Sequence, residues 1–207
     1  MKKREKIVIF GAGGHGRVVL DILAEAGADT AGFIDEDIQK AGSIINGFKV
    51  LGDWKYLEGR KDLSVALGIG DNEMREKIFR KAKKFGLDIR SAVHPKAVIS
   101  RTAKLGEGVV IMAGAVVNTG AALEDGVVVN TGATVDHDCR LGRFCQLWPG
   151  SHLAGTVSVG EFSYIGTGAS VINNIRIGRE VTVGAGAAVI SDIPDNVKAV
   201  GVPAKII

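Results

Sequence analysis

The chain has 207 residues, of which 46% are hydrophobic and 24% charged, and its formal net charge is +3. This length and composition fit one large or two small globular domains with a well-formed core. Lys and Arg are scattered among Asp and Glu without a basic stripe, which argues against nucleic acid as a partner, and no apolar stretch is long enough for insertion into a membrane.

The first predicted elements are a strand, a glycine-rich turn, a helix and a second strand. The β-branched run 6–10 predicts a strand, and residues 11–16, Gly-Ala-Gly-Gly-His-Gly, follow it directly. Apolar residues at helical spacing over 18–23 predict a helix, which Gly27 ends. A second apolar run over 30–34 predicts the next strand. The order strand, glycine turn, helix, strand is typical of a nucleotide-binding unit.

The glycine turn has a physical interpretation as a phosphate and ribose site. Glycine lets the backbone approach a pyrophosphate, the helix N-terminus offers free N–H groups, and Asp35, 19 residues after Gly16, is placed to bind a ribose hydroxyl. Alone, this fingerprint points to NAD. A glycine-rich linker then leads to only one more strand over 64–69 and a charged helix over 73–85, which is roughly half a dinucleotide fold. A nucleotide-sugar fits a half-fold better, and glycines that only pack the helix on the sheet are the third interpretation.

A hexad repeat then begins at His94, so we place a domain boundary near residue 90. The 96 residues from His94 to Val189 make 16 hexads, in which every sixth residue is aliphatic and the residue two places before it is small or apolar. Neither a helix nor an amphipathic strand has a period of six, whereas a parallel β-helix does. If three hexads close one coil, residues 18 apart stack in ladders. The predicted domains are residues 1–90 and 91–207.

One turn of the repeat carries side chains that a bare solenoid does not need. His137 occupies a hexad position that faces outward or lies at a turn, and Asp136 and Asp138 flank it. Acids so placed can orient the imidazole and stabilise its protonated form, as a general base requires. With 18-residue coils, Thr119 lies one coil before His137 and Gly155 one coil after. We expect Gly155 to leave bare backbone beside His137, where a thioester could lie with an N–H near its oxygen.

Other departures from the repeat are weaker signals. Asn130 and Trp148 fall on one ladder and offer an amide and a flat apolar wall. His152 is expected at the surface or at an interface. Cys139 and Cys145 both fall on inward positions of their hexads, so we predict two reduced core thiols, which fits a cytoplasmic protein.

The whole chain resembles the PglD/NeuD-type sugar acetyltransferases, a group of hexapeptide-repeat acyltransferases. Five motifs carry the resemblance: residues 11–16, 33–36, 68–75, 130–138 and 201–205. It implies an α/β N-terminal half-Rossmann domain that binds a nucleotide-sugar. An all-β left-handed parallel β-helix of triangular section, which binds acetyl-CoA, is implied to follow. It also implies a cytoplasmic homotrimer without a metal, with active sites at the subunit interfaces.

The resemblance implies roles for individual residues. The catalytic group would be His137 as general base, Asp138 as the acid that raises its basicity, and Asn130. The nucleotide-sugar pocket would contain Gly13, Gly14, His15, Asp35, Glu36 and Gly70. The acetyl-CoA groove would contain Gln146, Gly155, Thr167 and Ala185. Two residues depart from the family pattern, because Gln146 stands where a second histidine is frequent and Asp138 is shorter than the glutamate of some members.

We therefore expect direct transfer of an acetyl group from acetyl-CoA to an amine of a nucleotide-linked amino sugar, in bacterial surface glycan biosynthesis. Three alternatives remain open at this point: a sugar O-acetyltransferase of the sialic-acid type, a nucleotide-sugar-binding protein without catalysis, and an NAD oxidoreductase. The sequence leaves open which sugar, nucleotide and acyl chain are used.

Overall fold

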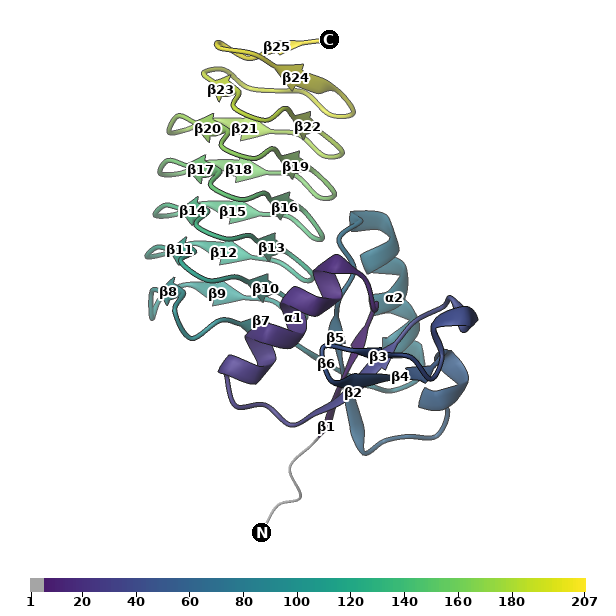
Figure 1. The fold of residues 1–207 in the computed structure, drawn as a ribbon. Coiled ribbons are helices and arrows are strands. Elements are labelled where there is room, and N and C mark those ends of the chain that lie inside the picture. Colours follow the sequence, from purple (N-terminus) through teal and green to yellow (C-terminus); the bar gives the residue numbers. More distant parts are fainter. Residues whose placement is uncertain (1–5) are drawn as a thin grey trace. The chain divides into compact units, whose positions relative to one another are not determined.

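The computed structural model describes residues 6–207, and the chain divides into two compact units, one ending at Pro95 and one running from Lys96 to Ile207 (Figure 1). Residues 1–5 of the predicted first domain lie outside the described residues. Among residues 6–207, no helix is both long enough and apolar enough to cross a membrane.

The first unit is a mainly parallel sheet with two α-helices, which confirms its predicted Rossmann-like character. The strands lie in the order β3-β4-β2-β1-β5-β6, and only β3 runs antiparallel to its neighbour. The elements are β1 (Lys6–Phe10), α1 (Gly14–Glu25), β2 (Thr30–Ile34), the 3₁₀ turn η1 (Ile38–Lys40), β3 (Ile44–Ile45), β4 (Phe48–Gly52), the 3₁₀ turn η2 (Trp54–Leu57), β5 (Leu63–Leu67), α2 (Asn72–Lys84), β6 (Asp88–Arg90) and β7 (Ala92–Val93).

The sheet is wider than the sequence predicts. β4 lies in the segment predicted as a glycine-rich linker and pairs with β2, and β6, a strand that the sequence does not predict, pairs with β5. β4 escaped prediction because Gly47 and Gly52 interrupt the apolar pattern, and β6 because three residues are too few to show one. The unit therefore has five parallel strands.

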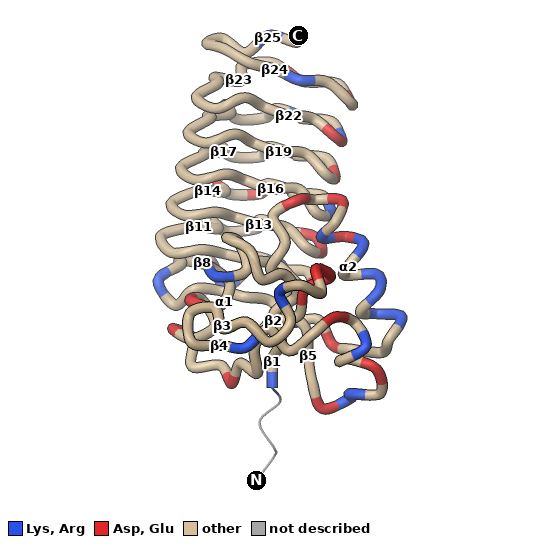
Figure 2. Tube along the Cα trace, turned by 45° about the vertical axis from the view of Figure 1, so that its right-hand side comes forward, with Lys and Arg blue, Asp and Glu red and all other residues tan. Residues whose placement is uncertain are grey.

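Each helix buries one apolar stripe. α1 buries Val19, Leu20, Ile22 and Leu23, as its helical spacing predicts. α2 is rich in Lys, Arg and Glu, which mark its course in Figure 2, and it buries Ile78, Phe79 and Ala82 together with Arg75. Asp71 caps α2, because its carboxylate accepts a 2.8 Å hydrogen bond from the Met74 N–H.

The second unit is a stack of coils whose short strands form three parallel sheets (Figure 1). Face I contains β8 (Val98–Ile99), β11 (Val116–Val117), β14 (Thr134–Val135), β17 (His152–Leu153), β20 (Ser170–Val171) and β23 (Ala188–Val189). Face II contains β9 (Lys104–Leu105), β12 (Ala122–Leu123), β15 (Arg140–Leu141), β18 (Ser158–Val159) and β21 (Arg176–Ile177). Face III contains β10 (Val110–Ile111), β13 (Val128–Val129), β16 (Gln146–Leu147), β19 (Tyr164–Ile165), β22 (Thr182–Val183) and β24 (Lys198–Val200), with β25 (Lys205–Ile206) antiparallel to β24.

Strand register confirms the predicted parallel β-helix and its 18-residue ladders. Val117 pairs with Val135, and Val135 pairs with Leu153. The aliphatic hexad positions are buried from Ile111 onward. Leu105 is 38% exposed because β9 is the edge strand of face II and has a neighbouring coil on one side only. Cys139 and Cys145 are thiols whose side chains are fully buried, as predicted.

Candidate active site

The His137 turn connects β14 on face I to β15 on face II, and we call this edge of the solenoid corner I/II (residues 100–103, 118–121, 136–139, 154–157 and 172–175). The His137 and Asp138 side chains are 52% and 63% exposed, and His137 Nδ1 lies 3.0 Å from Asp138 Oδ2. A neutral imidazole that donates from Nδ1 to this carboxylate keeps its Nε2 lone pair free. The pair can therefore accept a proton at Nε2, as a general base must.

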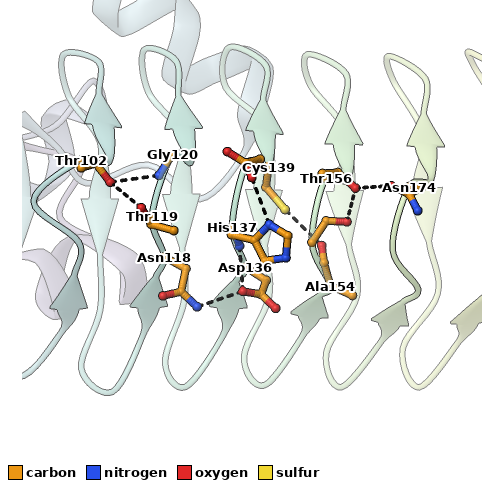
Figure 3. A network of polar contacts seen from close by, with 12 residues as sticks. Thr102, Asn118, Thr119, Gly120, Asp136, His137, Cys139, Ala154, Thr156 and Asn174 are labelled. Carbon is orange, nitrogen blue, oxygen red and sulfur yellow. Dashed lines mark hydrogen bonds and ion pairs between the residues drawn. The ribbon is translucent and has the colours of Figure 1, made fainter.

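Hydrogen bonds within the turn and from the preceding coil hold this turn in place. The His137 N–H donates to Asp136 Oδ1 over 2.7 Å, and Asn118 Nδ2 donates to the same oxygen over 2.9 Å (Figure 3). The Asp138 N–H donates to the Thr119 carbonyl over 3.0 Å. Asp138 has φ 59°, so the turn is left-handed at the residue that follows His137. These bonds fix the backbone that carries both side chains.

The following coil lies against the imidazole at Gly155. A Cβ on Gly155 would stand 2.4 Å from His137 Nε2 and 2.5 Å from Cε1. The expected bare backbone beside His137 is therefore filled by the histidine ring itself, because the ring leans onto the glycine. The absent side chain at Gly155 makes room for the imidazole.

Other residues predicted for catalysis and acetyl-CoA binding lie elsewhere on the solenoid. Asn130, Thr167 and Ala185 lie on corner III/I, the edge between faces III and I (residues 112–115, 130–133, 148–151, 166–169 and 184–187), which carries no charged residue. The Asn130 Oδ1 accepts a 2.8 Å hydrogen bond from the Thr131 N–H. Gln146 lies on face III, is 4% exposed, and its Oε1 has no hydrogen-bond partner among the described residues. One copy of the chain therefore does not bring this set to His137.

His152 and Cys139 have separate surroundings. His152 lies on face I, is exposed, and its Nδ1 is 3.0 Å from Thr134 Oγ1. The buried Cys139 Sγ lies 3.2 Å from the Ala154 carbonyl oxygen (Figure 3), and burial raises the pKa of this thiol. A buried protonated thiol is a poor nucleophile, so Cys139 does not fit a covalent role.

The second candidate site lies in the first unit, at the carboxyl ends of β1, β2 and β5, where ligands of open α/β sheets bind. Gly11 and Gly16 pack closely against each other in the turn, since a Cβ on Gly16 would stand 1.8 Å from the Gly11 carbonyl oxygen. Gly13 and Gly14 are exposed, and a Cβ on either would meet nothing within 4 Å. α1 begins at Gly14 without a side-chain cap. The packing interpretation thus holds for part of the motif, and Gly13 and Gly14 stay open to a ligand.

Asp35 joins the end of β2 to the glycine turn. Its carboxylate accepts hydrogen bonds of 2.9 Å from the N–H groups of Ala12 and Asp37 and pairs with Lys40 Nζ at 3.0 Å. Burial raises the pKa of Asp35, but these hydrogen bonds and the lysine outweigh it and hold the pKa below its usual value. The adjacent Glu36 accepts a 3.0 Å bond from Trp54 Nε1. Asp35 is therefore ionised and fixed in position.

His15 and Gly70 face each other across the turn, since a Cβ on Gly70 would stand 3.9 Å from His15 Cβ. Burial, and secondarily the charge of Arg75, lower the pKa of His15 to about 4. Its Nε2 has no hydrogen-bond partner among the described residues. A neutral imidazole with an unpaired buried nitrogen is suited to hydrogen-bond a ligand.

Arg75 is a supporting residue whose role the sequence does not reveal. Its side chain is fully buried and donates to the carbonyls of Ile69 and Gly70, at 3.2 and 3.1 Å, and to Asn72 Oδ1 at 2.7 Å. It therefore holds the loop after β5. The sequence feature that could have indicated this role is an arginine in the first turn of a helix that follows a buried strand.

Residues 6–207 contain no cluster of three or more His, Cys, Asp or Glu that could hold a metal.

Comparison with known proteins bears on the family of the chain. Residues 6–82 match the PglD N-terminal domain family. The crystal structure of PerB from Caulobacter crescentus in complex with CoA and GDP-perosamine is 45% identical to this chain, covers 98% of it and 97% of PerB, and has a TM-score of 0.92. The acetyltransferase domain of PglB from Neisseria gonorrhoeae, in complex with acetyl coenzyme A, is 40% identical over 99% of this chain and 100% of that domain, with a TM-score of 0.93.

A curated relative is more distant. The UDP-N-acetylbacillosamine N-acetyltransferase of Bacillus subtilis is 37% identical over 123 residues, which is 53% of this chain and 52% of that enzyme. The matched region thus spans about half the length of this relative.

Proposed function

The chain belongs to the PglD-type family of sugar acetyltransferases, and from this membership we propose that it transfers the acetyl group of acetyl-CoA to an amine of a nucleotide-linked amino sugar. The observation that carries the proposal is the exposed His137–Asp138 pair, in which Nδ1 lies 3.0 Å from the carboxylate, on an acetyltransferase solenoid. PerB, which covers nearly the whole chain, was crystallised with CoA and a nucleotide-linked sugar.

The proposed reaction is a direct acyl transfer. The sugar nitrogen attacks the thioester carbonyl carbon, the C–N bond forms, and His137 Nε2 takes the proton that the nitrogen loses. Asp138 accepts from Nδ1–H and stabilises the imidazolium. The C–S bond then breaks, and the departing thiolate takes the proton back from His137. General-base catalysis of this kind contributes roughly 10²–10⁴-fold. The buried Cys139 thiol has no part in it.

The substrates are assigned to different units. Gly13 and Gly14 at the start of α1 receive the phosphates, while Asp35, Glu36, His15 and Gly70 surround the nucleotide-sugar. Acetyl-CoA lies along the solenoid beside Gly155, Gln146, Thr167 and Ala185. Because His137 and Asn130 lie on different corners, we propose that a cytoplasmic homotrimer joins corner I/II of one subunit to corner III/I of the next. We further propose that the protein acts in bacterial surface glycan synthesis, as the family resemblance implies.

The test is an acetyl-transfer assay with a panel of nucleotide-linked amino sugars. Release of coenzyme A is followed with a thiol reagent, and the product is analysed by mass spectrometry for one added acetyl group. Nucleotide-sugars with a hydroxyl in place of the amine are the matched controls, since an O-acetyltransferase would use them. Binding of an amino sugar without coenzyme A release would overturn the proposal in favour of a binding protein, and a melting-temperature shift with NAD would favour an oxidoreductase.

A further inference from the structure

The two oxygens of the Asp138 carboxylate face different neighbours. Oδ2 lies 3.0 Å from His137 Nδ1. Oδ1 points to the preceding coil, where a Cβ on Gly120 would stand only 2.3 Å from it. The two residues are 18 apart and occupy the same ladder position. Gly120 therefore lies directly beneath the carboxylate, and its missing side chain is the space that Oδ1 fills.

The backbone of this ladder does not itself demand glycine. The corresponding positions in other coils are Thr102, Asp138, Thr156 and Asn174, and the last three adopt φ of 59°, 60° and 62°. Gly120, with φ 70°, is the one glycine among these five positions. A left-handed turn thus accepts a side chain at this corner in three coils, and what distinguishes position 120 is the carboxylate above it.

We propose that Gly120 is a positioning residue for acetyl transfer, because its missing side chain lets Asp138 reach His137 Nδ1. A methyl group at position 120 forces the carboxylate or its turn to move, and Nδ1 loses its acceptor. The imidazole then shifts toward the tautomer that carries its proton on Nε2, which cannot act as the base. The effect on turnover rests on the proposed function, since it requires His137 to be the base, whereas the effect on the tautomer does not.

The first experiment compares Gly120→Ala with Gly86→Ala. Gly86 has nearly the same φ of 69°, lies in the first unit outside both candidate sites, and its Cβ would meet nothing within 4 Å, so this variant measures the cost of a left-handed alanine alone. We expect Gly120→Ala to lower kcat about 10- to 100-fold with the KM for acetyl-CoA unchanged, as for other lost orienting groups. Gly86→Ala should stay within about twofold of the wild type. Equal losses in the two variants would overturn the proposal.

The second experiment follows the ring nitrogens of His137 by ¹⁵N NMR, which needs no activity. The wild type should show the Nδ1–H tautomer, and Gly120→Ala should show a larger share of Nε2–H. An unchanged tautomer in Gly120→Ala would overturn the positioning role even if the wild type transfers acetyl groups. A wild type without transfer but with the expected tautomer change would overturn the proposed function and leave the positioning role supported.

A double-mutant cycle separates positioning from general disruption. In an Asp138→Ala background, Gly120→Ala should cause no further fall in kcat, because the group it displaces is gone. A full additional loss would contradict the proposal. If Gly120→Ala unfolds, Gly120→Asn makes the same comparison, since asparagine tolerates this backbone and occupies the ladder at Asn174.

Discussion

The two units hold their candidate sites by different physical means. In the first unit the site is a single turn at the ends of parallel strands, held by contacts between distant segments, such as Asp35 with the Ala12 N–H. In the solenoid the site is a departure from a repeat, and each residue has its neighbours 18 positions away, as Gly120 and Gly155 have with the His137 turn. A change in the solenoid should therefore act on one identifiable neighbour, whereas a change in the first unit should spread through the turn.

The largest effect is expected at His137. His137→Ala should lower kcat roughly 10²–10⁴-fold and leave the affinity for acetyl-CoA nearly unchanged, because the base acts on the proton and not on the cofactor. Steady-state kinetics and calorimetry measure the two quantities. His152→Ala is the matched control, since His152 is the other exposed histidine of residues 96–207 and lies on face I. Wild-type turnover in His137→Ala would remove this residue from the mechanism.

The next effect tests the first unit through its buried histidine. The pKa of His15 is lowered to about 4, so the unfolded chain binds a proton below about pH 6.5 that the folded protein does not bind until about pH 4. The free energy of unfolding should therefore fall as pH falls through this window, by up to about 3 kcal/mol from this group. His15→Asn should lack this part of the fall.

Trp54 fluorescence can follow that unfolding in a Trp148→Phe background, because Trp54 packs between Phe10 and Phe85 in the first unit. His152→Asn should keep the wild-type dependence on pH. Identical pH profiles for the wild type and His15→Asn would contradict the burial of a neutral histidine.

The same contrast explains what the sequence predicts about the solenoid. The hexad period predicts the β-helix, its ladders and the two core cysteines, because a repeat reports packing many times over. It also isolates His137, since no packing rule asks for histidine there. It does not predict that the imidazole leans onto Gly155 or that Asp138 extends over Gly120, because these depend on side-chain rotamers that spacing leaves open.

In the first unit, the sequence predicts the elements that carry motifs and misses the strands that lie between them. The glycine turn, α1 and β2 carry strong signals, so their presence and order follow from the sequence. β4 and β6 carry weak signals and form because the sheet offers them a partner. The burial of Arg75 is also set by the tertiary fold, since arginine in a charged helix normally predicts exposure.

Gly155 tests whether a change in the solenoid acts on one neighbouring side chain, the His137 ring. Gly155→Ala should lower kcat about 10- to 100-fold, because its methyl group displaces a ring that must stay within about an ångström of its place. It should also lower the melting temperature. Gly155 has no left-handed φ, so backbone strain adds little.

The control repeats Gly155→Ala in a His137→Ala background. There the added methyl group should no longer lower the melting temperature, because the ring it meets is absent. An equal loss in both backgrounds would show that the glycine packs against something other than His137. Calorimetry with acetyl-CoA in the same background tests the predicted contact of Gly155 with the cofactor.

The smallest effect is expected at Asp35, where two roles overlap. Asp35→Ala should weaken nucleotide-sugar binding about tenfold, the cost of one hydrogen bond to a charged group, and leave acetyl-CoA binding unchanged because the two ligands use different units. The carboxylate also accepts a hydrogen bond from the Ala12 N–H and pairs with Lys40, so the variant should unfold more easily as well.

Lys40→Met separates the two roles of Asp35, since it removes only the lysine's contact with Asp35 Oδ2 and leaves the carboxylate and its Ala12 bond in place. If Asp35 binds ribose, Lys40→Met should keep most of the sugar affinity. Equal sugar affinity in the wild type and Asp35→Ala would restrict Asp35 to supporting the turn, and the glycine motif would then bind its ligand through the backbone alone.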